Sequence, residues 1–271
     1  MTTTTVSTTT SSTTTARRAG TFSVTAAATL RSLRAVFRSP ALLIAPIAQS
    51  LFFLLVYAGQ LGNVGSSYLD DRAFIAFLLP LILFTGVATG AGAAGTMTLG
   101  DITSGYLDRL RMAHGTVAPF LAGTLVATLV AVTVQALLTT GGAVLVGYRP
   151  ADAAGTLGMI ALLLVLGVAV ALFGIAVAVR TASSSTTGLV TLAFFGLSFF
   201  TGVFAPVEEL SGWMRAIATV NPLTYVIDAA RQVEAGTALT AGPIAATVLV
   251  ALVAAGFAAC VLALGHARRN R

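Results

Sequence analysis

The sequence predicts an all-α integral membrane protein with six transmembrane helices. Hydrophobic residues make up 56% of the 271 residues and charged residues only 9%, and the mean hydropathy is +0.94. A soluble domain is about 25% charged. Six apolar runs reach the roughly 20 residues that a helix needs to cross the hydrocarbon. None of them shows the period-two alternation of a membrane β-barrel.

The predicted spans follow one another along most of the chain. They cover residues 41–60, 73–97, 118–146, 154–179, 186–205 and 243–265. The third and fourth are long enough to tilt in the bilayer. We assign residues 21–268 to one transmembrane domain and expect the Thr-rich tail at 1–20 to be disordered. The tail has no apolar stretch after a charged start, so it is not expected to be a secretory signal.

The arginines predict the orientation, because all 15 basic residues are Arg. An even number of spans places both termini on one side. Eleven arginines share that side: Arg17, Arg18, Arg31, Arg34, Arg38, Arg109, Arg111, Arg180, Arg268, Arg269 and Arg271. Four fall on the other side: Arg72, Arg149, Arg215 and Arg231. The positive-inside rule therefore predicts cytoplasmic termini. We expect no nucleic-acid partner, because the arginines form no continuous basic stripe.

Residues 21–38 predict an amphipathic helix that lies in the cytoplasmic interface. Arg31, Arg34 and Arg38 fall on one helical face, and Leu30, Leu33 and Phe37 fall on another. Pro40 is expected to end this helix and to turn the chain into the first span. Two interpretations stay open: a plain membrane anchor, or an elbow helix that moves during a transport cycle.

Enzyme chemistry has little support in the sequence. His114 and His266 are far apart, and the HExxH, CxxC and GxSxG motifs are absent. The single Cys260 cannot form an internal disulfide. The cores of the spans hold no acidic residue, which disfavours transport coupled to an ion gradient within this chain. We expect neither a cofactor nor a metal on this chain.

The spans carry uncharged polar side chains instead: Gln49, Ser50, Thr85, Thr89, Thr128, Thr133 and Gln135. Hydrogen bonding between helices is their simplest interpretation. All of them except Ser50 and Thr128 are assigned to a candidate substrate path. Gly86 and Gly90 have the GxxxG spacing that lets membrane helices pack closely.

A compact polar block, DITSGYLDRLRMAHG, occupies residues 101–115 between the second and third spans. Tyr106, Leu107 and Leu110 can share one face of a short helix, while Asp108, Arg109 and Arg111 project elsewhere. Such a helix either covers the membrane surface or docks onto a soluble partner, with Asp101 and the arginines fixing the orientation.

The segment between the fifth and sixth spans, residues 199–236, predicts two short external helices that dip into the outer leaflet and return. Pro206 is expected to open the first, with Glu208 and Glu209 in its first turn. Trp213 suits a membrane interface. Asn221 and Pro222 have the pattern of an N-cap and a first helical residue. Arg231 is expected to pair with Asp228.

At these residues the chain resembles the membrane subunits of ABC-2-type ABC transporters, especially the permeases of daunorubicin-resistance type. Arg38-Ser39-Pro40 precedes the first span, and GYLDRLRMAHG, from Gly105, is similar to the family's Gly-x-Leu-x-x-Leu-Arg block. FxPVxxLxxWM, from Phe204 to Met214, precedes NPLTYVIDAAR, from Asn221 to Arg231. The likeness covers about residues 20–268. The family often has Pro where this chain has Ala113 or His114.

The resemblance implies roles for these residues. A coupling helix seated on an ATPase subunit would use Asp101, Gly105, Tyr106, Leu107, Arg109, Leu110 and Arg111. The elbow helix would use Arg31, Arg34 and Arg38. The external gate would use Pro206, Trp213, Asn221, Pro222 and Arg231. The Walker A motif requires lysine, which this chain lacks, so ATP and Mg are expected on a separate ATPase subunit.

The expected function is therefore a permease subunit, not an enzyme, that exports an amphiphilic drug or antibiotic through the bacterial plasma membrane. A second permease copy, identical or different, would complete the unit among the membrane lipids. Export of a lipid or a glycan is the first alternative. A membrane scaffold or immunity protein without transport activity is the second, and a secondary transporter is the third.

Overall fold

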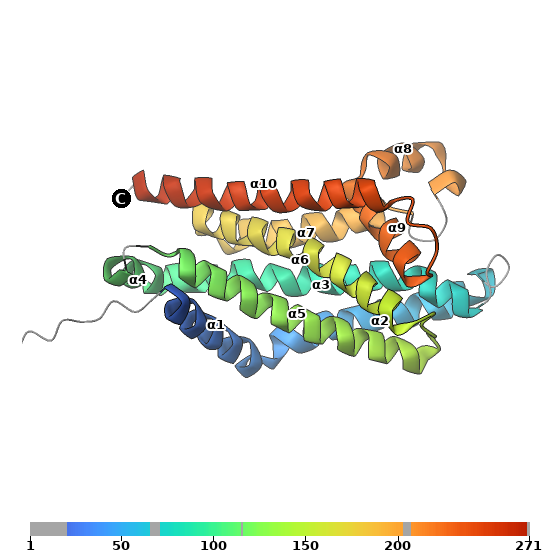
Figure 1. The fold of residues 1–271 in the computed structure, drawn as a ribbon, viewed down its shortest axis with the longest axis horizontal. Helices are drawn as coiled ribbons and strands as arrows, with labels where there is room; N and C mark the ends of the chain where they lie inside the picture. The colour runs from blue at the N-terminus through green and yellow to red at the C-terminus, as the bar shows by residue number, and fades with distance from the viewer. Residues whose placement is uncertain (1–20, 66–70, 115, 203–206, 270–271) are drawn as a thin grey trace, which may run out of the picture.

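The computed structural model describes residues 21–65, 71–114, 116–202 and 207–269. These parts of the chain are helical and contain no strand (Figure 1). The elements are α1 (Thr21–Arg38), α2 (Pro40–Gly65), α3 (Asp71–Thr103), α4 (Tyr106–His114), α5 (Ala118–Val146), α6 (Ala153–Thr181), α7 (Ser184–Phe199), the 3-10 turn η1 (Val207–Glu209), α8 (Gly212–Val220), α9 (Pro222–Glu234) and α10 (Gly242–Arg269). The predicted tail at 1–20 lies outside the described residues.

Five helices among the described residues are long and apolar enough to cross a membrane, namely α2, α3, α5, α6 and α10. The predicted fifth span, 186–205, corresponds to α7, which has 16 residues and ends at Phe199. At about 1.5 Å per residue, α7 is shorter than the roughly 30 Å hydrocarbon core. The Asn221 side chain contributes to this early end, because its Nδ2 donates to the carbonyls of Leu197 (2.7 Å) and Phe200 (3.0 Å).

Helix α3 forms the centre of the bundle. It packs against α2, α5, α6 and α7. Of its most apolar 18-residue window, 78% is buried by other parts of the protein, compared with 17% for the corresponding windows of α2 and α10. The outer helices therefore present most of their apolar surface outward, as expected for helices that face lipid.

Helix α1 packs on α5 through a face that the sequence pattern did not predict. Ala28, Ser32 and Val36 are buried, whereas Leu30 and Phe37 are about half exposed. A Cβ at Gly123 of α5 would lie 2.7 Å from the Ala28 Cβ, so the two helices approach closely there. The small side chains, spaced four apart, form the packing face, and the predicted apolar face points away from the bundle.

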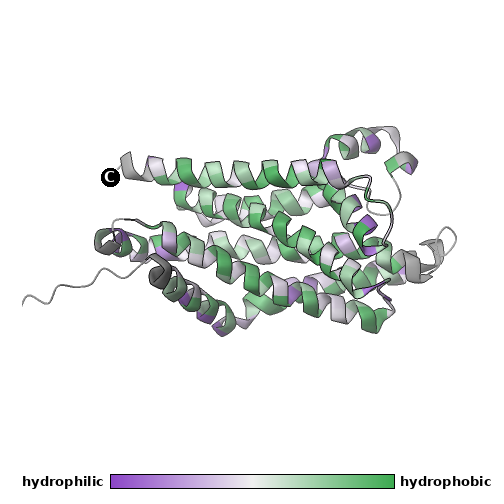
Figure 2. Cartoon of the chain, viewed as in Figure 1, coloured by the Kyte–Doolittle hydropathy of each residue, from purple (hydrophilic) through white to green (hydrophobic). Residues whose placement is uncertain are grey.

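The bundle has two distinct ends (Figure 1). Helix α4, the start of α1 and the end of α10 lie at one end, and α8 and α9 lie at the other. Hydrophilic residues gather toward both ends, while the middle is mostly apolar (Figure 2). The predicted coupling helix and the predicted external helices are thus separated by the length of the bundle.

Candidate functional site

The polar block folds as the end of α3, a sharp turn and the short helix α4. Gly105 lies in the left-handed region, with φ +68°, which favours glycine. The Gly105 amide donates to the Ile102 carbonyl at 3.0 Å, and the Ser104 hydroxyl donates to the Asp101 carbonyl at 3.3 Å. Glycine therefore permits the turn that directs α4 away from the axis of α3.

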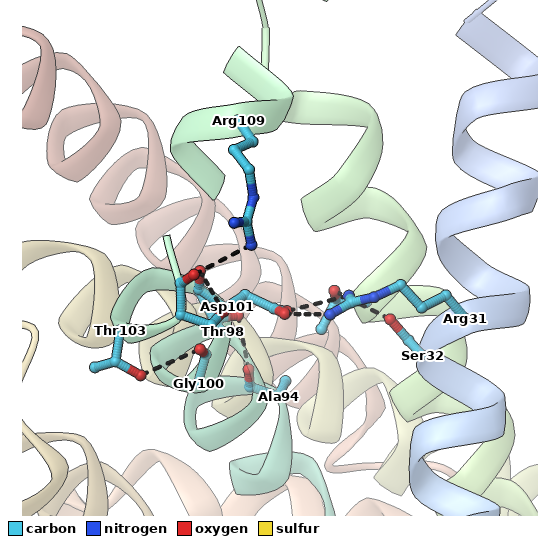
Figure 3. Close-up of polar contacts among 10 residues, drawn as sticks. Arg31, Ser32, Ala94, Thr98, Gly100, Asp101, Thr103 and Arg109 are labelled. Carbon is cyan, nitrogen blue, oxygen red and sulfur yellow. Dashed lines mark hydrogen bonds and ion pairs between the residues drawn. The ribbon is translucent and has the colours of Figure 1, made fainter. Parts of the chain in front are cut away.

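The block is joined to α1 by an ion pair. Arg31 of α1 donates through both terminal guanidinium nitrogens to the two carboxylate oxygens of Asp101, with Nη1 3.4 Å from Oδ2 (Figure 3). Asp101 is buried, with 7% of its surface exposed. The hydrogen bond from Asp101 raises the pKa of Arg31, against the opposing effect of burial. Arg31 therefore stays a cation.

Two aromatic rings complete the surroundings of Arg31. Its guanidinium carbon lies 4.0 Å from the ring centre of Tyr106 and 5.5 Å from that of Phe120. The two rings meet edge to face, 5.5 Å apart. Cation–π contacts of this kind add to the ion pair. We call Arg31, Asp101, Tyr106 and Phe120 the Arg31 cluster; it brings α1, α3, α4 and α5 together at one point.

Helix α4 turns one face to the bundle and one outward. Leu107 is buried, and Tyr106 and Leu110 pack partly against the core, as predicted for this face. Arg109 is exposed and its Nη2 donates to the Ser104 carbonyl at 3.2 Å. Met112 is 80% exposed. Arg111 is half-buried at the same end of the bundle.

The remaining predicted residues of α1 do not join the cluster. Arg34 and Arg38 are exposed. Helix α1 ends at Arg38, and Pro40 is the first residue of α2, as the sequence predicted. Arg31 is thus the arginine of the predicted elbow helix that contacts the polar block.

At the opposite end, Asn221 connects α7 to α9. Its Oδ1 accepts from the Leu223 amide at 3.0 Å, which confirms the predicted N-cap with Pro222 as the first helical residue of α9. Its Nδ2 donates to the carbonyl of Leu197 in α7 and to that of Phe200, directly after α7. Asn221 is 4% exposed, so these bonds are made away from water. One buried amide therefore ends α7 and begins α9.

The first external segment consists of a 3-10 turn followed by the short helix α8. Pro206 lies outside the described residues, Val207–Glu209 form a 3-10 turn, and α8 starts at Gly212. Trp213 is 64% exposed, which suits the predicted interface position.

Arg231 of α9 is held against the start of α3. Its Nη1 donates to Asp228 at 3.0 Å, which confirms the predicted pair. Its Nε donates to the Phe77 carbonyl at 3.0 Å, and its guanidinium lies 3.8 Å from the centre of the Phe77 ring. Its Nη2 is buried with no partner among the described residues. The local pair is therefore part of a long-range contact between α9 and α3.

The residues of the predicted substrate path lie on α2, α3 and α5. Thr89 donates to the Gln49 side chain at 3.2 Å, which joins α3 to α2. Thr85 and Thr133 instead donate to carbonyls of their own helices. Gln135 lies against Gly86 and Gly90 of α3. Gln49 of α2 and Gln135 of α5 therefore both contact α3 within residues 86–90.

Two contacts had no signal in the sequence pattern. The Phe120 ring contacts the Arg31 guanidinium, yet in the sequence Phe120 is an ordinary apolar residue at the start of a predicted span. The buried Tyr148 hydroxyl donates to Glu234 at 2.8 Å and joins the α5–α6 connection to the end of α9. Among the described residues, no three His, Cys, Asp or Glu side chains gather as a metal site.

The family of the chain is shown by its similarity to known proteins. The family model of the ABC-2 type transporter matches residues 24–235. The chain is 28% identical to the "Daunorubicin resistance ABC transporter permease protein DrrB1" of Streptomyces coeruleorubidus over 224 residues, 82% of this chain and 78% of that protein. It is 26% identical to the "Probable doxorubicin resistance ABC transporter permease protein DrrC" of Mycobacterium tuberculosis, over 84% of this chain and 82% of that protein. This chain therefore belongs to the ABC-2 type transporter family, among relatives named as permeases of drug-resistance ABC transporters.

Proposed function

We propose that this chain is the permease subunit of an ABC exporter that moves an amphiphilic drug-like molecule out of the bacterial cytoplasm. A separate ATPase subunit supplies the energy. The family supports the proposal, with relatives named for daunorubicin and doxorubicin resistance. The position of α4 at one end of the bundle, with Arg109 and Met112 exposed, supports it as well.

The Arg31 cluster is the observation that carries the proposal. A helix that only covered the membrane surface would need no buried charge beneath it. Here Arg31 of α1 forms an ion pair with Asp101, near the end of α3, and its guanidinium lies against the ring of Tyr106, the first residue of α4. A push on α4 would therefore reach α1 and α3 together, which is what coupling to an ATPase requires.

We infer the orientation of the chain in the membrane from the arginines near α4. Arginines on α1 and α4 and in the C-terminal segment share one side, which we place in the cytoplasm together with both termini. Helices α8 and α9 then face outward and act as a gate. Asn221 and Arg231 hold this gate to α7 and α3. A second permease copy, identical or different, completes the transport unit.

The test is purification of the complex from its native membranes in mild detergent, followed by mass spectrometry. We expect an ABC ATPase at close to one copy per permease. The matched preparation carries Leu110→Asp, which places a charge on the inner face of α4 while leaving the spans unchanged. A stable permease without any ATPase would contradict the proposal and favour a membrane scaffold.

A further inference from the structure

A small pocket lies inside the bundle, between the α1–α2 junction, α3 and α5. It has a volume of about 10 Å³, close to the least that a single water molecule needs. Its lining is Val36, Leu42, Leu43, Gly90, Ala93, Met97, Thr128, Ala131, Val132 and Gln135. Leu42, Leu43, Ala93 and Met97 are half-buried, so the approach to the pocket is apolar.

Two buried polar side chains, Thr128 and Gln135, line the pocket. Thr128 is 1% exposed, and its hydroxyl has no hydrogen-bond partner among the described residues. Gln135 is 2% exposed and lines the same pocket. Leaving a buried polar group unpaired is unfavourable. The unpaired Thr128 hydroxyl at the pocket therefore indicates that a bound group supplies its partner.

Gly86 and Gly90 make the room that Gln135 occupies. A Cβ at Gly86 would lie 2.7 Å from the Gln135 Nε2, and one at Gly90 would lie 2.8 Å from the Val132 Cγ1 and in collision with the Gln135 Oε1. The GxxxG spacing therefore serves a purpose besides close packing of two helices. It holds a buried amide against the backbone of α3, beside the pocket.

The chemistry of the lining restricts the ligand. Gln135 and Thr128 each donate and accept a hydrogen bond, and the lining contains no charged residue. Such a pocket suits a neutral hydroxyl or carbonyl oxygen and does not suit a phosphate or an ammonium group. The half-buried apolar approach suits a hydrophobic body attached to that oxygen.

We propose that this pocket is a recognition site for the hydroxyl or carbonyl group of an amphiphile that enters from the cytoplasmic leaflet. The inference rests on the proposed export function and specifies the site where the cargo is recognised. Gln135 and Thr128 bind the oxygen, while Leu42, Leu43 and Met97 contact the apolar body. Val36, which lines the pocket, lies on α1, the same helix that carries Arg31. Binding in the pocket is therefore expected to affect the contact between Arg31 and α4.

The test uses the intact complex of permease and ATPase in lipid nanodiscs and in vesicles. Two fluorescent probes represent the two sources of cargo: daunorubicin for drugs and a labelled monoacylglycerol for lipids. Gln135→Leu and Thr128→Val remove the hydrogen bonds at nearly constant volume. Thr133→Val is the matched control, because Thr133 is on the same helix and its hydroxyl donates to the Leu129 carbonyl at 2.7 Å.

We expect both pocket variants to weaken equilibrium binding of at least one probe by about three- to tenfold, the effect of one lost hydrogen bond. Thr133→Val should change it less than twofold. Ala131→Cys in a Cys260→Ala background should also be protected from a membrane-permeant maleimide by the bound probe. The probe that binds identifies the cargo as drug-like or lipid-like.

The outcomes separate the two proposals. Binding that depends on Gln135 and Thr128, without ATP-driven transport in vesicles, would overturn the export function and keep the site. ATP-driven transport with pocket variants equal to the control would keep export and overturn the site. If neither probe binds in a way that depends on these residues, the pocket holds only water and the proposal is wrong.

Discussion

Arg31 and Asp101 are 70 residues apart in the chain, yet both terminal nitrogens of Arg31 contact the carboxylate of Asp101. The pair joins α1 to the last turn of α3, directly before the turn into α4. The Tyr106 ring, from the first residue of α4, lies against the same guanidinium. The Arg31 side chain therefore contacts both the end of α3 and the start of α4, the predicted coupling helix.

Arg31→Lys tests whether this contact transmits force. Lysine keeps the charge but lacks the planar fork that makes a two-point bond and stacks on a ring. The Arg31 side chain is 43% exposed, so we expect the free energy of unfolding to fall by only about 1 kcal/mol. Transport per ATP hydrolysed should fall about fivefold, while the ATPase stays bound. The measurement is ATP-driven uptake of a fluorescent drug into inverted vesicles, with hydrolysis recorded in parallel.

Arg34→Lys is the control for this prediction, because Arg34 is an exposed arginine on the same helix. It should retain wild-type coupling. If the two variants behave alike, the Arg31 cluster only strengthens the fold and does not transmit movement. Asp101→Asn should reproduce the effect of Arg31→Lys, and the double variant should lose little more than either single one.

Leu110→Asp tests the role of α4 itself. Leu110 packs partly against the core on the inner face of α4, and a charge there should displace the helix. We expect the amount of ATPase that copurifies to fall at least fivefold, while the permease still reaches the membrane. Thr103→Ala, at the exposed end of α3, should leave the association unchanged. Equal association in both variants would argue that α4 does not dock on the ATPase.

Features with local physical causes were predictable from the sequence. Pro40 ends α1 and begins α2, and Asn221 with Pro222 begins α9, because proline geometry and N-capping depend on a few adjacent residues. The predicted span at 118–146 has the bounds of α5. The Asp228–Arg231 pair was predictable since residues three apart lie on one helical face.

Long-range contacts were not predictable. Helix α1 packs through Ala28, Ser32 and Val36, because α5 offers a glycine there, and only the partner decides which face is buried. The early end of α7 depends on Asn221, more than 20 residues further on. A hydropathy pattern describes how apolar a residue is, but it contains no information about which distant side chain meets its backbone.

Tyr148→Phe tests the buried contact at the outer end. Burial raises the pKa of Tyr148 well above its ordinary value, so the hydroxyl remains a donor to Glu234. Removing it should cost about 1–3 kcal/mol, because a buried carboxylate oxygen loses its partner. The measurement is the midpoint of thermal unfolding in detergent. Tyr225→Phe, whose hydroxyl donates to the Thr219 carbonyl in a more exposed place, should cost less.

The same contact predicts a pH dependence. The folded state favours the neutral phenol, so its stabilising effect is complete below the ordinary tyrosine pKa of about 10 and is lost as the pH rises above it. The difference in thermal midpoint between the wild type and Tyr148→Phe should therefore shrink above about pH 10. A constant difference at all pH values would contradict a raised pKa of the Tyr148 hydroxyl in the folded state.

Asn221 allows the sharpest test of the external gate, because aspartate separates its two roles. Asn221→Asp keeps the acceptor for the Leu223 amide, and Asp and Asn are about equal as N-caps. The substitution also replaces the Nδ2 donor by an oxygen that faces the carbonyls of Leu197 and Phe200. If capping of α9 were the main role, Asn221→Asp would be tolerated and Asn221→Ala would cost about 1 kcal/mol. We expect the reverse order, with aspartate at least as destabilising as alanine, because it buries oxygen against oxygen.

Trp213 is the single tryptophan of the chain and lies on α8, so its emission reports loosening of this segment directly. A red shift or increased quenching by iodide in Asn221→Asp, absent in Thr219→Ala, would show that the end of α7 is held by this amide. Wild-type emission and wild-type thermal stability in Asn221→Asp would show that the bonds to α7 do not hold the gate.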